Sequence, residues 1–109
     1  EHTFELDQLD SQAVLAQLSL IVTRVMKKAK EMSVAGRLGE VKIRYQGFET
    51  HTHGRSIPVA MDDEAVFMRL AYGLFAENVD LDRPIRLVGF RLGNLEMPLS
   101  RQSTLDFEE

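Results

Sequence analysis

The stretch VKIRYQGFETHTHGRSI at residues 41–57 determines the expected fold, because its two halves differ in where their apolar side chains fall. In the first half, apolar residues alternate with basic or amide residues: Val41, Ile43 and Tyr45 with Lys42, Arg44 and Gln46. Successive side chains of a strand point to opposite faces. This half is therefore predicted to bury one face and to present positive charge on the other.

The second half follows a turn at Gly47 and is predicted to form the partner strand. From Glu49 onward it has no large apolar residue before Ile57, so both of its faces are polar. Gly54 lies inside it, where a glycine often marks a β-bulge or a close backbone approach. A strand with two polar faces is expected to have something polar to contact.

Amphipathic helices are predicted on both sides of this hairpin. The first begins at Asp10 or Ser11, either of which can cap it, and ends at the glycine-containing residues 36–39. Its apolar stripe consists of Val14, Leu18, Ile21, Val22, Val25, Ala29 and Met32. The second is opened by the acidic residues 62–64 and is ended by residues 78–84. Its stripe consists of Val66, Phe67, Leu70, Ala71, Leu74 and Phe75.

A first and a last strand are predicted near the two ends of the chain. HTFELD at residues 2–7 alternates polar and apolar residues. RPIRLVGFRL at residues 83–92 reads as the last strand and contains Arg86 and Arg91, with Gly89 as a possible bulge that would change which side chains point outward.

The element order is therefore βαββαβ, and it predicts an α+β fold. Two helices would cover one face of a four-stranded antiparallel sheet and leave the other face open. We expect residues 1–95 to form this domain and residues 96–109 to form a flexible tail. The length of 109 residues and the hydrophobic fraction of 44% suit one ordinary core.

Composition limits the environment and the function classes. There is no cysteine, which excludes disulfides and thiolate metal sites, and no apolar run approaches the roughly 20 residues that span a bilayer. We expect a cytoplasmic protein without a membrane partner. The first residue is Glu1 rather than an initiator Met, so we expect a segment of a longer chain.

Charge is segregated along the chain. The net charge is −4, which by itself argues against nucleic acid, yet residues 24–55 hold eight basic and three acidic residues. Acidic residues dominate residues 1–10 and 62–82. On charge alone, a solvated basic end of a helix is preferred to a binding face as the explanation of this distribution.

The expected open face carries groups suited to phosphate. Guanidinium and ammonium groups supply charge, while hydroxyl and backbone N–H groups fix position without reading bases. The candidate residues are Lys42, Arg44, Thr50, Thr52, Gly54, Arg55, Ser56, Arg86 and Arg91. No aromatic residues interleave with them, which favours duplex backbone over stacked single strands.

Signs of catalysis are weak, and we assign no catalytic residue and no metal site. There is no phosphate-binding glycine motif, nucleophile elbow or HExxH sequence. His51 and His53 would share one face of a strand, which permits a metal pair, but no third ligand is placed and surface histidines are the preferred explanation. Asp62 and Asp63 form a pair of carboxylates that a helix N-cap explains more simply.

The tail EMPLSRQSTLDFEE contains a second candidate motif. Gln102, Leu105 and Phe107 form QxxLxF, in which an extended peptide could place two apolar side chains into a partner's pockets. An unstructured terminus is the alternative.

Together these segments resemble the little finger domain of Y-family translesion DNA polymerases, closest to the bacterial DNA polymerase IV branch, with the UmuC branch as the alternative. EHTFELD, VKIRYQGFETHTHGRS, RPIRLVGFRLGNL and the tail QSTLDF carry the resemblance. It implies a non-catalytic domain of an error-prone polymerase that holds primer-template duplex through its phosphates.

The resemblance also implies partners. The polymerase's Mg²⁺ would belong to the palm domain, so no cofactor is expected here, and QxxLxF would dock on the bacterial sliding clamp. Ser103 and His53 depart from the family pattern, which often has leucine and a basic residue there. A ferredoxin-like interaction or small-ligand regulatory module is the main alternative, and a small enzyme using His51 and His53 is the weakest.

Overall fold

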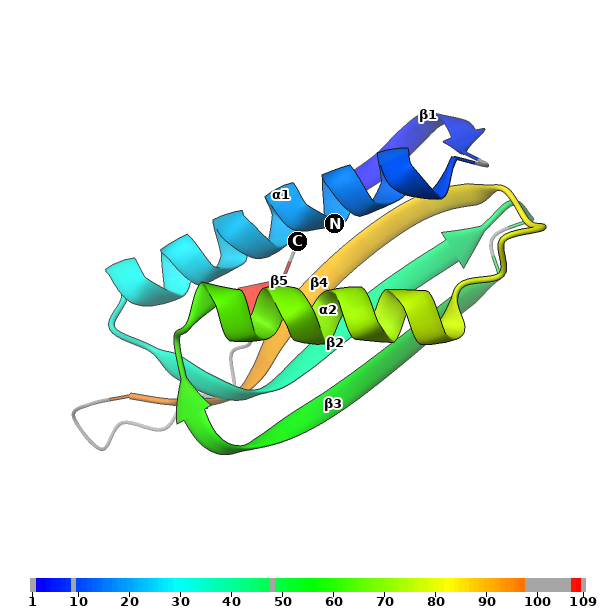
Figure 1. The fold of residues 1–109 in the computed structure, drawn as a ribbon. Coiled ribbons are helices and arrows are strands. Elements are labelled where there is room, and N and C mark those ends of the chain that lie inside the picture. The colour runs from blue at the N-terminus through cyan, green and yellow to red at the C-terminus, as the bar shows by residue number, and fades with distance from the viewer. Residues whose placement is uncertain (1, 9, 48, 98–106, 109) are drawn as a thin grey trace.

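The computed structural model describes residues 2–8, 10–47, 49–97 and 107–108, with side chains for 10–47 and 49–97. The elements are β1 (His2–Gln8), α1 (Ser11–Glu31), β2 (Ala35–Tyr45), β3 (Thr50–Met61), α2 (Glu64–Asn78), β4 (Ile85–Glu96) and β5 (Phe107–Glu108). They form an α+β fold with both helices on one face of an antiparallel sheet, as expected (Figure 1).

The sheet is centred on β4 and β2. Its strand order is β1-β4-β2-β3, and β5 also pairs with β4. β1 contacts the beginning of β4 through the pairs His2↔Val88 and Thr3↔Leu87. β2 lies between β4 and β3 along most of its length, which makes β3 the outer strand on that side.

The two-residue strand β5 was not expected, because the tail from residue 96 was predicted to be flexible. Its backbone pairs with Arg91 and Leu92 of β4, on the edge that β1 occupies near Val88. β1 leaves that later part of the β4 edge uncovered, and unpaired backbone groups on a strand edge readily accept another segment.

Each helix begins at an aspartate cap. The Asp10 carboxylate accepts a hydrogen bond from the Gln12 N–H at 2.9 Å. The Asp63 carboxylate accepts from the N–H groups of Ala65 and Val66 at 2.9 and 3.4 Å. These three bonds satisfy donors that the first helical turn leaves unpaired, and Asp63 is the cap predicted from the acidic run.

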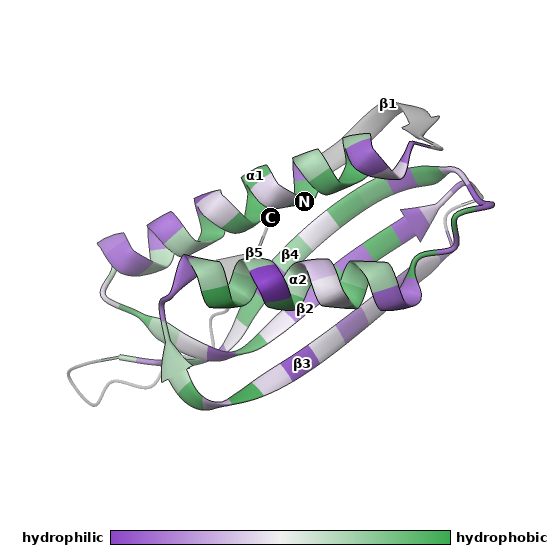
Figure 2. Ribbon diagram, viewed as in Figure 1, coloured by the Kyte–Doolittle hydropathy of each residue, from purple (hydrophilic) through white to green (hydrophobic). Residues whose placement is uncertain are grey.

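The core fills the space between the helices and the sheet. Its largest fully buried side chains include Phe67, Phe75 and Phe90. Figure 2 shows hydrophobic residues along β4 and a mostly polar β3. In the described part of the chain, no helix is both long and apolar enough to cross a membrane.

Gly36 and Gly39 were predicted to end the first helix, and this was wrong because both lie inside β2. The helix ends earlier, where Ser33 adopts a positive φ of 55°. A Cβ at Gly39 would lie 2.7 Å from the Leu70 Cδ2 atom, so the missing side chain lets α2 pack closely against β2.

The register shifts also differ from prediction. Gly54 and Gly89 lie in regular register opposite Glu40 and Lys42, so neither is a bulge. The extra residue in β4 is Arg86, between the pairs Arg44↔Leu87 and Tyr45↔Ile85. In β3 the register shifts between Ser56 and Met61, a stretch that contains Pro58, whose nitrogen has no hydrogen to donate.

Candidate nucleic-acid interface

The register defines which side chains share the surface of the sheet opposite the helices, here called the open face. Residues directly opposite each other on neighbouring strands point to the same side. Because Val41, Ile43 and Tyr45 are buried in the core, their neighbours along β2 point away from the helices. The cross-strand rows are Thr50, Arg44 and Leu87; Thr52, Lys42 and Gly89; Gly54, Glu40 and Arg91; and Ser56, Leu38 and Gly93.

Basic and hydroxyl groups meet on two of these rows. The Arg44 Nε–H donates to the Thr50 Oγ1 atom at 2.8 Å, which holds the guanidinium group against β3. Lys42 lies one row further on, opposite Thr52. Both basic side chains are half-buried, whereas both threonines are exposed. The two rows therefore place basic groups beside hydroxyl groups on one face of the sheet.

The next row contains an ion pair. The Arg91 Nε–H donates to Glu40 Oε1 at 3.1 Å, and Arg91 Nη2–H donates to Glu40 Oε2 at 2.9 Å. Each side chain is 25% exposed. Such a two-bond contact between guanidinium and carboxylate fixes both groups. The sequence places Arg91 on the open face correctly, but Glu40 was not among its candidates.

Three glycines lie on the open face, and only Gly54 of them is exposed. Gly54, Gly89 and Gly93 each occupy a different row and leave backbone where a side chain would otherwise stand. A Cβ at Gly54 would lie 3.0 Å from the Glu40 Cγ atom, and one at Gly93 would lie 3.1 Å from Arg91 Nη1. The missing side chains at Gly54 and Gly93 leave room for the Glu40–Arg91 ion pair to lie flat across the sheet.

Arg55 is not on the open face, contrary to prediction. It faces the helices, where its Nη2 atom lies 2.7 Å from the Glu77 carboxylate of α2. A Cβ on Gly73 of the same helix would be 3.7 Å from Arg55 Nη1. The reason is parity: Thr52, Gly54 and Ser56 share one side of β3, and the residues between them share the other.

Arg86 and Ser56 complete the predicted set. Ser56 is exposed opposite Leu38 on the open face. Arg86 is half-buried at the β4 bulge, between Ile85 of the core and Leu87 of the open face.

The histidines lie on the helix side of β3, as Arg55 does. The rings of His51 and His53 are stacked with centroids 6.4 Å apart, and Tyr45 meets His51 edge-on at 5.8 Å. Within the described residues, no group of three or more His, Asp and Glu side chains is placed to hold a metal ion.

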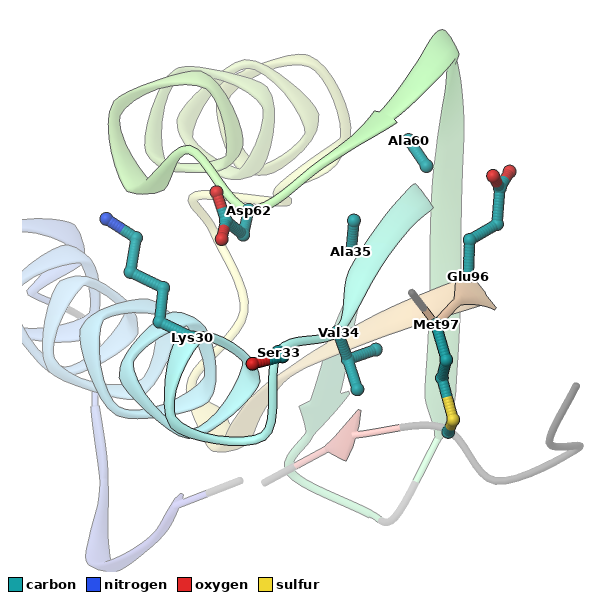
Figure 3. A pocket seen from close by; sticks show the side chains of 8 residues that line it. All are labelled: Lys30, Ser33, Val34, Ala35, Ala60, Asp62, Glu96 and Met97. Atoms are coloured by element: carbon teal, nitrogen blue, oxygen red, sulfur yellow. The ribbon is translucent and has the colours of Figure 1, made fainter. Parts of the chain in front are cut away.

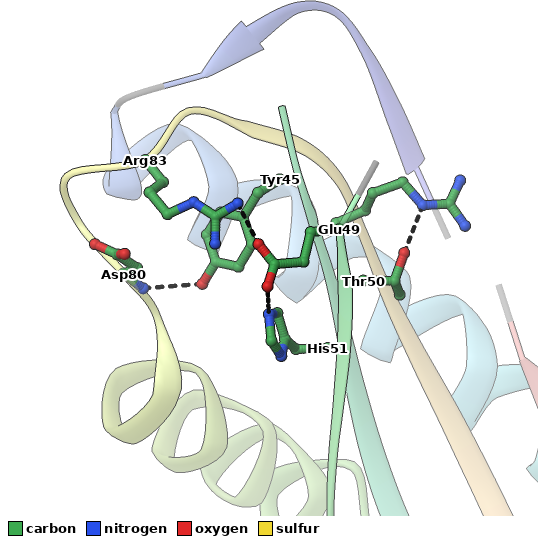
Figure 4. Close-up of polar contacts among 7 residues, drawn as sticks. Tyr45, Glu49, Thr50, His51, Asp80 and Arg83 are labelled. Carbon is green, nitrogen blue, oxygen red and sulfur yellow. Dashed lines mark hydrogen bonds and ion pairs between the residues drawn. The ribbon is translucent and has the colours of Figure 1, made fainter. Parts of the chain in front are cut away.

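A polar cluster beside Tyr45 and His51, at the end of the sheet where β2 turns into β3, was not predicted from the sequence (Figure 4). The Glu49 carboxylate lies 2.5 Å from Arg83 Nη2 and 3.1 Å from His51 Nε2. The Arg83 guanidinium holds the pKa of Glu49 below its ordinary value, and His51 makes a smaller contribution in the same direction. Arg83 also lies over the Tyr45 ring at 4.4 Å, and the Tyr45 hydroxyl accepts from the Asp80 N–H. The cluster ties the loop before β4 to the hairpin turn.

A hollow of about 440 Å³ opens at the other end of the sheet (Figure 3). It is lined by Lys30, Ser33, Val34, Ala35, Ala60, Asp62, Glu96 and Met97. Its polar groups come from the ends of different elements, and no nucleophile stands beside a base among these residues. We assign it no catalytic role.

The tail motif lies largely outside the described residues. Gln102 and Leu105 belong to the part of the chain that is not described, and Phe107 is described only through the backbone pairing of β5 with β4. The geometry therefore does not test the predicted docking peptide.

Sequence comparison relates nearly the whole chain to one family. Residues 1–105 match the impB/mucB/samB family C-terminal domain. DNA polymerase IV of Methanoculleus marisnigri is 34% identical over 106 residues, which cover 97% of this chain and 29% of that protein. DNA polymerase IV of Staphylococcus haemolyticus is 29% identical over 110 residues, covering 100% of this chain and 31% of that protein. The chain thus spans about three tenths of the length of these relatives.

Solved structures share the fold. The insertion ternary complex of Dbh DNA polymerase matches with a TM-score of 0.63 and 14% identity, over 87% of this chain and 27% of that one. The complex of the beta-clamp processivity factor and the little finger domain of PolIV matches with a TM-score of 0.59 and 20% identity, over 95% of this chain and 93% of that one.

Proposed function

Because the chain belongs to the impB/mucB/samB family of C-terminal domains, the little finger domains of Y-family DNA polymerases, we propose that its open face holds duplex DNA by the phosphate backbone. In this proposal β1 is the fourth strand of a complete βαββαβ domain, and the helices carry the sheet without touching the ligand.

The observation that carries the proposal is the pair of basic rows on the open face. Lys42 and Arg44 stand beside the exposed hydroxyls of Thr52 and Thr50. Phosphate oxygens accept hydrogen bonds from such groups, and binding of this kind is salt-dependent and almost independent of sequence. The Dbh ternary complex, which has the same fold, supports a role in a polymerase that handles DNA.

We further propose that this domain is non-catalytic and that the parent protein is a DNA-directed translesion polymerase. DNA polymerase IV relatives are about three times as long as this chain, so the rest of such a protein would supply the catalytic carboxylates and their Mg²⁺. The histidine enzyme considered from the sequence finds no group of three metal ligands within the described residues.

The tail is proposed to dock on the sliding clamp through Gln102, Leu105 and Phe107. The QxxLxF spacing suits an extended peptide that inserts apolar side chains into pockets. The solved complex of a little finger domain with a beta-clamp supports this choice of partner.

The DNA proposal is tested by comparing Arg44→Gln with Arg55→Gln. Both remove one positive charge, on neighbouring strands, but the first lies on the open face and the second faces α2. We expect Arg44→Gln to weaken duplex binding, measured by fluorescence anisotropy, and to reduce the slope of log K against log salt by about 0.9, the value for one phosphate contact. Arg55→Gln should leave both nearly unchanged. Equal effects of the two substitutions would refute the assignment of the face.

The clamp proposal is tested by titrating purified sliding clamp with the chain and with Leu105→Ala plus Phe107→Ala. The double variant should lose binding because both apolar anchors are gone. Leu99→Ala, which shortens a tail leucine outside QxxLxF, is the control and should bind as the unmodified chain does. If the double variant binds as tightly as the control, the tail is not the docking element.

A further inference from the structure

Glu40 is an acidic residue in the middle of the open face. It occupies the row between Lys42 and Leu38 on β2, opposite Gly54 on one side and Arg91 on the other. A phosphate-binding surface gains nothing from a carboxylate at its centre, because like charges repel. Its presence there calls for a role.

The position of Glu40 is fixed by its neighbours. Two hydrogen bonds of 3.1 and 2.9 Å join it to the Nε and Nη2 edge of Arg91, and both side chains are three-quarters covered. On its other side, the space above Gly54 would be closed by a Cβ 3.0 Å from Glu40 Cγ. The carboxylate therefore lies in one place on the surface, beside the basic rows.

Electrostatically, the pair removes one positive charge from the face. Arg91 and Glu40 together are neutral, so this pair contributes a dipole rather than a net charge to the open face. The Nη1 atom of Arg91 lies over Gly93, pointing away from the carboxylate. A phosphate that approaches this row meets a guanidinium group and a carboxylate that are joined by hydrogen bonds.

We propose that Glu40 sets the strength of duplex binding by cancelling the charge of Arg91 on the open face. This inference rests on the proposed function of that face and concerns the same ligand, the phosphates of duplex DNA. Attenuated binding suits a domain that must hold duplex without a fixed position, since weak, charge-driven contacts permit sliding.

The test compares Glu40→Gln with Glu77→Gln in the chain as it stands. Both remove one negative charge and one partner of an arginine, but Glu77 pairs with Arg55 on the helix side. Glutamine keeps an oxygen that can accept from Arg91, so Glu40→Gln changes charge more than orientation. Glu77 lies on the helix side of β3, so the sheet separates its carboxylate from a duplex on the open face, and charges more than about 10 Å apart are largely screened at 0.1 M salt.

We expect Glu40→Gln to bind duplex DNA about 3- to 10-fold more tightly at about 0.1 M salt, as one unit charge within several ångströms of a phosphate implies. Its log K against log salt should become steeper by about 0.9. Glu77→Gln should change affinity less than about twofold because its charge is screened. Unchanged or weaker binding by Glu40→Gln, while the unmodified chain binds, overturns the inference; weaker binding would indicate that Glu40 orients Arg91.

A second comparison covers the case in which Glu40→Gln unfolds in a thermal melt. Arg91→Gln leaves the Glu40 carboxylate unbalanced and should weaken binding, whereas Glu40→Gln with Arg91→Gln removes both charges of the pair and should recover most of the lost affinity. Absence of recovery overturns the inference. If the unmodified chain shows no salt-dependent duplex binding, the proposed function itself fails. That result is distinct from a failure of the inference, which is judged only from the variants of a chain that binds.

Discussion

Two glycine-to-alanine substitutions are predicted to change stability in opposite directions. At Gly39 an added Cβ would lie 2.7 Å from Leu70 Cδ2, 3.3 Å from Phe67 Cδ1 and 3.5 Å from Phe90 Cε1. Leu70 can move, but the two rings restrict where it goes. At Gly73, in the middle of α2, the nearest atom would be Arg55 Nη1 at 3.7 Å, an ordinary contact.

The magnitudes follow from these distances. Overpacking a core costs about 1–3 kcal/mol, and the lower entropy of the unfolded alanine chain offsets about 0.4–1 kcal/mol of it. Gly39→Ala should therefore destabilise the fold by about 1–2 kcal/mol. Gly73→Ala should stabilise it by about 0.8–1 kcal/mol, the difference in helix propensity. For a domain of this size, about 1 kcal/mol corresponds to roughly 4–8 °C in Tm.

Urea denaturation followed by circular dichroism measures both effects, and an unchanged m-value would show that the unfolded state is comparable. Each variant is the control for the other, because both substitutions add the same Cβ methyl group. Gly39→Ala with a stability equal to or above that of the unmodified chain would refute the close approach of α2 to β2.

Three further predictions concern single side chains. Asp63→Ala should destabilise the fold by about 1 kcal/mol in chemical denaturation because two N–H groups lose their acceptor, whereas Asp62→Ala should cost only a few tenths. Phe67→Ala should cost about 3–5 kcal/mol, since the ring is fully buried, and a loss below 1 kcal/mol would contradict its place in the core. Arg83→Met should raise the pKa of Glu49 in an NMR titration, because the guanidinium is the main cause of the lowered value. The stabilisation linked to Glu49 is present above the carboxyl's unfolded pKa and is lost as pH falls through the lowered folded value, so this loss should be smaller in Arg83→Met.

Much of the fold was predictable because apolar periodicity was strong where the core forms. Val41, Ile43 and Tyr45 alternate in a way that only a half-buried strand explains, and all three are buried. The glycines of β2 were misread for a different reason. Gly39 appears in sequence as a helix terminator, and the close approach of Leu70 that requires it comes from an element 31 positions later.

The candidate site was less predictable because its charges are paired across strands. Arg55 was placed on the wrong side because β3 has no apolar residues before Ile57 to reveal which of its faces is inward. Glu40 has the i and i+2 spacing to Lys42 that puts it on the open face, and this signal was present in the sequence. Its pairing with Arg91 required the β2–β4 register, which periodicity alone does not supply.

The narrow space above Gly54 also constrains how this surface can change over evolutionary time. A side chain at position 54 would meet the Glu40 side chain within 3.0 Å, so the two positions are not independent. Replacing Gly54 first is expected to be harmful, whereas the same replacement after Glu40 has been shortened is expected to be tolerated. The order of mutations would then decide which variants are accessible, a form of epistasis that links the charge of the face to its shape.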